Sequence, residues 1–172
     1  MRHLHLLRHA KSDRHPGVED HERPLARRGR KESSLVGASL PAALGRLDLV
    51  LCSTALRTRE TAALALANFA PPPPILFEDG LYLAGRAALL ARLRQLDNRI
   101  EGVLVIGHNP GLADLALALA DPDSPHYKLL ASGKFPTAVR VSFAIDGAWA
   151  DLARSRHRLT HYVTAKSLGK EG

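Results

Sequence analysis

Arginine and histidine side chains follow the ends of three predicted strands. Arg8 and His9 come directly after the first apolar run, and His108 follows the fourth strand after a single glycine. Arg57 lies one helical turn beyond the end of the second strand. Because ligands of open α/β sheets bind beyond the carboxyl ends of the strands, we expect these four side chains to meet at one edge of a sheet.

Two arginines and two histidines together suit the handling of a phosphoryl group. A guanidinium matches phosphate oxygens with a rigid fork and keeps its charge. A neutral imidazole is a competent nucleophile near neutral pH, because its ordinary pKa is about 6.5. We therefore predict His9 as the nucleophile, provided that its other ring nitrogen donates to a carbonyl or carboxylate. Arg8 and Arg57 would bind phosphate, and a protonated His108 would donate to the transferring group.

The residues after His108 extend the predicted phosphate site. Asn109-Pro110-Gly111 offers a helix cap, a proline at the first helical position and a small residue. Asn109 and the amides of the following helix would then face the same anion. Each motif also has an ordinary explanation. Arg-His occurs four times in the chain, Arg57 can pair with Glu60 on a helix surface, and GHNPG can be a simple capped turn.

The strands that position these residues alternate with helical patterns. This alternation predicts repeated βα units and a mainly parallel sheet, in a single domain spanning residues 1–172. The predicted strands are 3–7, 47–52, 75–77, 103–106 and 139–145, with a further strand around Trp149. The predicted helices are 27–40 (ending before Pro41), about 53–69 with Ser53 as cap, 87–96 and 112–120. Residues 71–74 read as a stiff proline connector and 121–136 as a loop.

The chain is strongly basic. Its formal charge is +7 and its pI about 10.1, which fits a phosphorylated substrate, a nucleic acid or an anionic membrane. Aromatic residues are few and do not alternate with basic ones, which argues against single-stranded nucleic acid. We predict no specific nucleic-acid partner, and a basic C-terminal tail over about 154–172.

Other sequence features bear on location and cofactors. No apolar run approaches the roughly 18 residues of a membrane span, and Cys52 is the only cysteine. We therefore expect a cytoplasmic protein without membrane attachment or an internal disulfide, and Cys52 as a core residue. The histidine pairs His3/His5 and His157/His161 lack a third ligand, so we predict no metal.

Several segments together resemble a known family. LLRHAKSD (6–13) resembles the RHG/RHA motif of the histidine phosphatase superfamily. The other segments resemble its small SixA-type phosphohistidine phosphatase branch, namely DHERPLARRGR, LVLCSTALRTRETA, LYLAG, VLVIGHNPGL and FPTAV. The resemblance implies a three-layer α/β/α sandwich, like that of the phosphoglycerate mutases, and no metal or other cofactor. It also implies His9 as the phosphorylated nucleophile, Arg8, Arg57 and His108 as phosphate ligands, and Ser53 and Thr58 as supporting residues.

Two departures from the family pattern concern a cap and an acid. Ala26 stands where many relatives have a serine or threonine that caps the first helix. Larger members of the superfamily use a carboxylate to protonate the leaving oxygen, and Glu78 and Asp79 are the candidates here, although solvated loop carboxylates are the simpler interpretation. A site without an assured acid suits P–N cleavage, because the imidazole of a phosphohistidine leaves readily.

We therefore expect a phosphatase that acts on phosphohistidine in a protein through a phosphorylated His9. Two alternatives stay open at this point. One is a phosphatase for a small phosphorylated metabolite or nucleotide, and the other is a phosphate-binding module with little turnover.

Overall fold

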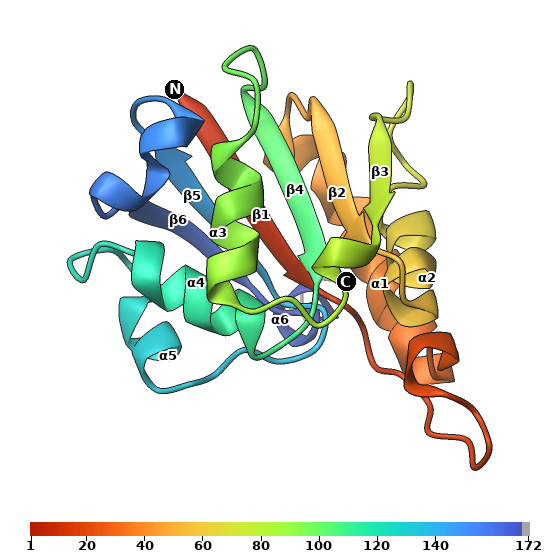
Figure 1. Ribbon diagram of the computed structural model, residues 1–172. Coiled ribbons are helices and arrows are strands. Elements are labelled where there is room, and N and C mark those ends of the chain that lie inside the picture. Colours follow the sequence, from red (N-terminus) through yellow and green to blue (C-terminus); the bar gives the residue numbers. More distant parts are fainter. Residues whose placement is uncertain (170–172) are drawn as a thin grey trace.

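The computed structural model describes residues 1–169 and contains a six-stranded sheet between two layers of helices (Figure 1). The strand order is β3-β2-β4-β1-β5-β6. The first four strands are parallel, whereas β5 runs antiparallel to β1 and β6 antiparallel to β5. This confirms the predicted α/β/α sandwich with a mainly parallel sheet. The strands are β1 (Arg2–Arg8), β2 (Leu49–Ser53), β3 (Ile75–Glu78), β4 (Gly102–Gly107), β5 (Arg140–Ile145) and β6 (Arg158–Val163).

Two hydrophobic cores fill the space between the sheet and its helices. In β4, Val103 and Val105 belong to one core and Leu104 and Ile106 to the other, and all four are at most 1% exposed. A strand buried on both faces is continuous in apolar residues, which is why β4 could be predicted. One face packs against α1 (Arg27–Leu44), α2 (Leu56–Ala65) and α6 (Ala165–Gly169). The other packs against α3 (Arg86–Arg94), α4 (Gly111–Leu119) and α5 (Tyr127–Ala131).

Helix α1 begins at Arg27 as predicted and extends beyond its predicted end. It continues through Pro41 to Leu44, where the sequence predicts an end before the proline. The last turn persists because Leu40 and Leu44 are buried in the core, and tertiary packing outweighs the hydrogen bond that a proline cannot donate. At the other end, the N-cap residue Ala26 makes no side-chain cap. The departure from the family pattern therefore leaves this helix uncapped.

The second helix is shorter than predicted. α2 spans Leu56–Ala65 and its N-cap is Ala55, so Ser53 is not its cap residue. The Ser53 hydroxyl does accept a hydrogen bond from the Ala55 amide at 3.3 Å. The same hydroxyl is also hydrogen-bonded to His108, which follows the end of β4.

The C-terminal third holds the largest corrections. Residues 121–136 are not wholly a loop, since they contain α5. The predicted strand around Trp149 is wrong, because Trp149 opens a 3-10 helix, Trp149–Arg154. Its side chain is fully buried, and its indole N–H donates to the Ile100 carbonyl at 2.8 Å. The last strand is β6, and the predicted basic tail is part of the fold as far as Gly169. The remainder of that tail, 170–172, lies outside the described residues.

Candidate active site

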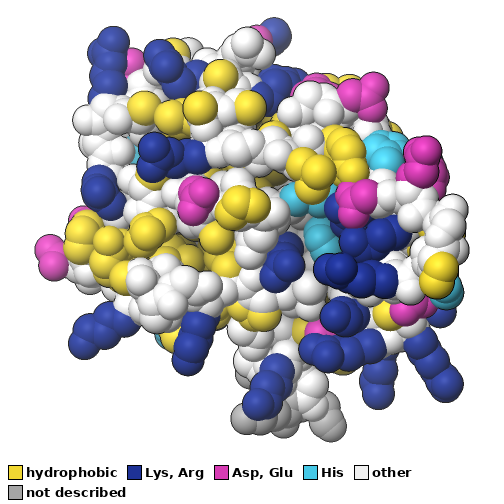
Figure 2. All heavy atoms as spheres, turned by 60° about the horizontal axis from the view of Figure 1, so that its bottom comes forward, with side chains coloured by type: hydrophobic (Ala, Val, Ile, Leu, Met, Phe, Trp, Pro, Cys, Tyr) yellow, Lys and Arg dark blue, Asp and Glu magenta, His cyan; other side chains and the backbone are white. Residues whose placement is uncertain are grey.

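The ends of β1 and β4 lie side by side. Arg8 is in register with Gly107, and the His9 amide donates to the Gly107 carbonyl at 3.1 Å. This pairing places the imidazoles of His9 and His108 with their ring centres 5.4 Å apart. Figure 2 looks onto this edge of the sheet, where histidine side chains lie among a group of Lys and Arg side chains.

His9 is held in one tautomer by the chain itself. Its Nδ1 lies 2.7 Å from the carbonyl oxygen of Ala10, and a carbonyl can only accept, so Nδ1 carries the proton. Burial, together with the nearby charges of Arg57 and Arg8, lowers the pKa of His9 from 6.5 to about 4, although the Ala10 carbonyl opposes the shift. The ring is therefore neutral at pH 7, and its Nε2 lone pair is available for nucleophilic attack.

Arg8 and Asn109 share one partner. The Nη1 of Arg8 and the Nδ2 of Asn109 donate to the carbonyl oxygen of Phe135, at 2.9 and 3.0 Å. The Nε of Arg8 and the Oδ1 of Asn109 are buried and make no hydrogen bond within residues 1–169. Asn109 does not cap α4, and the Leu112 amide is already bonded to the His108 carbonyl at 3.0 Å. The Oδ1 of Asn109 is an acceptor and cannot bind an anion, whereas Nδ2 carries two hydrogens and keeps one beyond its bond to Phe135.

His108 is buried and bonded to Ser53. Its Nε2 lies 2.8 Å from the Ser53 hydroxyl, while its Nδ1 is buried without a partner in the described chain. Burial, followed by the charges of His9 and Arg57, lowers the pKa of His108 from 6.5 to about 3. The ring is neutral at pH 7, where the sequence predicts a protonated one. An arriving phosphoryl dianion favours the charged form and raises this pKa.

Arg57 is paired with Asp20, a carboxylate that is not among the predicted site residues. The guanidinium is 3% exposed, and it donates to the backbone and side-chain oxygens of Asp20 at 2.7 and 3.0 Å. The alternative pairing with Glu60 is absent, since Glu60 accepts from the Leu25 amide at 2.8 Å. A buried guanidinium requires a counter-charge, and this requirement could have indicated an acidic partner for Arg57.

Tyr82 joins the same network. Its hydroxyl donates a short hydrogen bond to Asp20, and its ring lies edge-on to His108 with centres 5.5 Å apart. The bond from Tyr82, helped by Arg57, lowers the pKa of Asp20 from 3.8 to about 2. Asp20 is therefore a carboxylate at neutral pH, facing Arg57 and Tyr82.

The two candidate acids have other partners. Glu78 accepts two hydrogen bonds from Arg92 on α3, at 2.7 and 3.0 Å. Asp79 accepts from the Thr54 hydroxyl at 2.7 Å, and Thr54 is bonded in turn to His21, whose ring lies edge-on to Tyr82. The structure thus connects Asp79 to the edge of the site through a chain of contacts, and directs Glu78 to a helix.

The comparisons with known proteins decide the family. The model of the histidine phosphatase superfamily (branch 1) matches residues 4–82. A solved structure from Nakamurella multipartitia, assigned as the phosphohistidine phosphatase SixA, is 32% identical and covers 94% of this chain and 95% of its own, with a TM-score of 0.82. The chain belongs to the SixA-type branch of the histidine phosphatase superfamily.

Two further relatives span similar lengths. The histidine phosphatase is 26% identical to a structure from Agrobacterium tumefaciens, also assigned as SixA, with 95% and 97% of the two chains covered and a TM-score of 0.78. An uncharacterized protein of Mycobacterium tuberculosis is 36% identical over 148 residues, which are 85% of this chain and 91% of its own. Membership of the histidine phosphatase superfamily makes this chain a phosphatase.

Close backbone contacts fix the walls of the phosphatase site. A Cβ atom on Gly111 would lie 1.9 Å from the carbonyl oxygen of Ala84, so the first residue of α4 must be glycine at this spacing. Thr58, a predicted supporting residue, donates to the backbone oxygens of Ser53 and Ala55 at 2.9 and 2.7 Å. It therefore stabilises the turn that presents Ser53 to His108.

The remaining candidates lie apart from the site. His3 and His5 stack on β1 with ring centres 6.4 Å apart, and His161 lies on β6, not on a helix. Within residues 1–169, no group of three or more histidine, cysteine, aspartate or glutamate side chains is placed to hold a metal ion. In the same part of the chain, no helix has the length and apolar character needed to cross a membrane. Cys52 is buried in the core, and burial raises the pKa of its thiol to about 12.

Proposed function

We propose that this phosphatase hydrolyses phosphohistidine on a protein through a phosphorylated His9. The observation that carries the proposal is a neutral nucleophile in a site whose nearby carboxylates are bonded to other side chains. Asp20 has a pKa of about 2, and Glu78 is paired with Arg92. Asp79, the other candidate acid, accepts from the Thr54 hydroxyl, so neither candidate is hydrogen-bonded to His9.

The leaving group decides between substrate classes. An alkoxide is a strong base and leaves slowly without a proton, so esters call for a general acid. The imidazole of a phosphohistidine is a weak base and leaves as a neutral or easily protonated ring. A site that binds phosphate and supplies a nucleophile, but no acid, favours cleavage of the P–N bond.

The proposed reaction has two steps. The Nε2 of His9 attacks phosphorus, the bond from phosphorus to the substrate imidazole breaks, and the released ring nitrogen takes a proton from water. A water molecule then attacks the phosphorylated His9: its oxygen joins phosphorus, the bond from phosphorus to Nε2 breaks, and the water proton that is released replaces the one taken from solvent in the first step. Phosphate leaves and neutral His9 is restored. Arg8 and Arg57 balance the charge of the equatorial oxygens in both steps, with His108 and Asn109 as further donors.

A second candidate function has one observation in its favour. Asp79, Thr54 and His21 form a hydrogen-bonded chain at the edge of the site. Such polar groups would bind the hydroxyls of a small phosphorylated metabolite. This reading keeps the same nucleophile and changes only the leaving group. A cytoplasmic location stays a prediction under both readings.

The test compares substrates on one enzyme. Hydrolysis of a phosphohistidine protein is measured beside a panel of phosphate monoesters, for the wild type, His9→Ala and the loop control His15→Ala. We expect P–N cleavage to exceed ester cleavage, and His9→Ala to lose roughly 10³-fold or more of kcat while His15→Ala keeps it. Faster cleavage of the monoesters would transfer the proposal to a metabolite, and radiolabelled phosphate trapped on a residue other than His9 would exclude the mechanism.

A further inference from the structure

A groove beside the phosphate-binding residues has no part in the reaction described above. Two adjoining hollows of about 560 and 220 Å³ form it, and Pro136 and Thr164 line both. The larger hollow lies between α5, the end of β6 and α6, and the smaller one reaches the first turns of α1. We call these two hollows together the side groove.

The side groove and the phosphate site share a wall. The segment from Lys134 to Thr137 lines the groove, while the Phe135 carbonyl on the same segment binds Arg8 and Asn109. Whatever fills the groove therefore lies next to the residues that hold phosphate.

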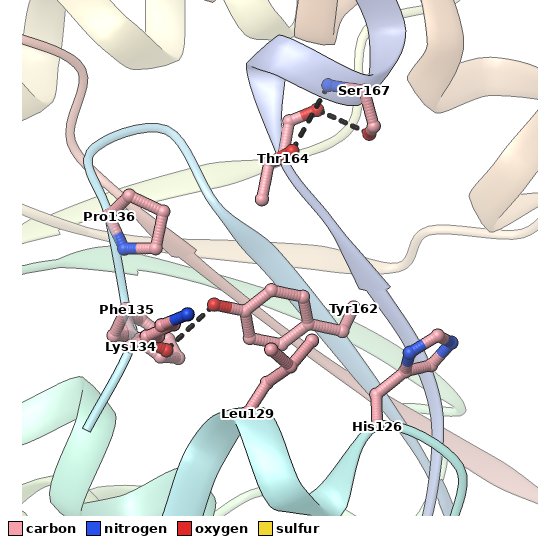
Figure 3. A pocket seen from close by; sticks show the side chains of 8 residues that line it. All are labelled: His126, Leu129, Lys134, Phe135, Pro136, Tyr162, Thr164 and Ser167. Carbon is pink, nitrogen blue, oxygen red and sulfur yellow. Dashed lines mark hydrogen bonds between the residues drawn. The ribbon is translucent and has the colours of Figure 1, made fainter. Parts of the chain in front are cut away.

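The surface of the larger hollow is mostly apolar. Figure 3 shows the ring of Tyr162 lying across it, with Leu129 on one side and the 134–136 segment beyond the hydroxyl. The Tyr162 hydroxyl donates to the Lys134 carbonyl at 2.7 Å, which fixes the ring and leaves its face to the hollow. The buried side chain of Phe135 completes the lining. Such a surface accepts apolar side chains.

The edges of the groove are basic. Lys134 and Lys166 are exposed, and neither belongs to an ion pair among residues 1–169. Arg28 forms only a loose pair with Glu32, at 3.7 Å. Among residues 1–169, Glu32 is the one acidic residue that lines the groove. Together with the overall charge of +7, this edge selects an acidic partner.

We infer that the side groove docks an acidic segment of the phosphorylated protein itself, with apolar side chains in the hollow and carboxylates against Lys134, Lys166 and Arg28. The inference rests on the proposed function and extends it. It places substrate selection outside the phosphate site, because the phosphoryl group is the same in every substrate and only the surrounding chain differs.

Three probes with the same scissile bond test the docking. The first is free phosphohistidine, and the second is a 20-residue peptide with one phosphohistidine among leucine and glutamate residues. The third is the same peptide with lysine in place of glutamate. We expect kcat/KM for the acidic peptide to exceed that for the other two by about tenfold, mostly through KM, because charges at the edge of an interface act on association.

Charge reversal locates the effect. Lys134→Glu/Lys166→Glu should lower kcat/KM for the acidic peptide about tenfold, raise it for the basic peptide, and leave free phosphohistidine within about twofold. The matched control is Arg154→Glu/Arg158→Glu, which changes the net charge equally at two exposed residues outside the groove. Leu129→Ser should raise KM for the acidic peptide alone.

The outcomes separate the two proposals. Equal rates on both peptides and on free phosphohistidine in the wild type would overturn the docking and leave the proposed function intact. A loss on free phosphohistidine as large as that on the acidic peptide would do the same, because the groove would then act only through the fold. Failure of the wild type to hydrolyse any of the three would overturn the proposed function.

Discussion

Two clusters of arginine and histidine occur along strand β1, and they differ in where their side chains originate. The strand-end cluster consists of Arg8, His9, Arg57 and His108. The mid-strand cluster consists of His3, His5, Arg140 and His161. Its members project from one face of β1, β5 and β6, where the register pairs His5 with Ser142 and Ser142 with His161. Residue types alone do not distinguish the clusters.

Histidine pKa values do not distinguish them either. Burial, Arg140 and the two neighbouring histidines lower the pKa of His5 to about 3, below that of His9. The difference lies in hydrogen bonding. Arg140 and His5 both bond to the Ser142 hydroxyl within the sheet. In the strand-end cluster, the side chains come from separate turns and bond to four different partners, Phe135, Ala10, Asp20 and Ser53. Each cluster contains buried polar atoms without a partner in the described chain, His5 Nε2 in one and Arg8 Nε and His108 Nδ1 in the other. Convergence beyond strand ends, and not a perturbed pKa, is what indicates catalysis.

The largest expected effect tests this difference directly. Arg57→Lys should lower kcat roughly 10²-fold, because an ammonium cannot replace the fork that faces Asp20 and phosphate. Arg140→Lys, an equally buried guanidinium in the mid-strand cluster, should keep kcat within about threefold while lowering the thermal midpoint. Steady-state kinetics and thermal melts of both variants provide the measurement. Equal losses of kcat would remove the distinction between the clusters.

A smaller effect is expected at Asp20, which holds Arg57 in place. Asp20→Asn keeps the size of the side chain and removes the charge, so kcat should fall about tenfold. Asp20→Glu keeps the charge and should therefore retain more of the wild-type kcat. Because the folded pKa is about 2, below its ordinary 3.8, Asp20 stabilises the fold above pH 3.8 and loses this contribution as the pH falls toward 2. The half-exposed carboxylate makes that contribution modest. Between pH 4 and pH 2, the thermal midpoint of Asp20→Asn should therefore depend less on pH than that of the wild type. An unchanged kcat in Asp20→Asn would show that Asp20 contributes to stability alone.

The smallest expected effect concerns the stability of the mid-strand cluster at acidic pH. The pKa of His5 is lowered in the folded chain, from 6.5 to about 3, so the unfolded chain binds the extra proton first. The contribution of neutral His5 to the free energy of unfolding is complete above pH 6.5 and declines as the pH falls toward 3. His5→Asn should reduce the slope of the thermal midpoint between pH 6.5 and pH 4, with kcat at pH 7 unchanged. His9 and His108 titrate with the same sign, so part of the slope should persist.

Local sequence pattern predicted the central sheet well and the loops poorly. β4 is a continuous apolar run and β1 alternates leucine with histidine before Leu7, so the ends of both strands can be located and the positions of Arg8, His9 and His108 followed from them. Asp20 and Tyr82 were not selected, because their contacts join segments 37 and 62 residues apart and no periodicity encodes such pairs. β6 was misread as a tail because arginines and histidines interrupt its apolar alternation, although Leu159 is fully buried.

The glycine at the start of α4 has a consequence for how this enzyme can vary. With a carbonyl oxygen only 1.9 Å from where its Cβ would lie, Gly111 sets the spacing between the turn that carries His108 and the segment that carries Tyr82. A side chain at residue 111 would push these two segments apart, because the atoms it would meet first are backbone atoms of Ala84 and Gly85. Substitution of Gly111 is therefore expected to change the contact between Tyr82 and His108, whose ring centres lie 5.5 Å apart, without removing any side chain of the site.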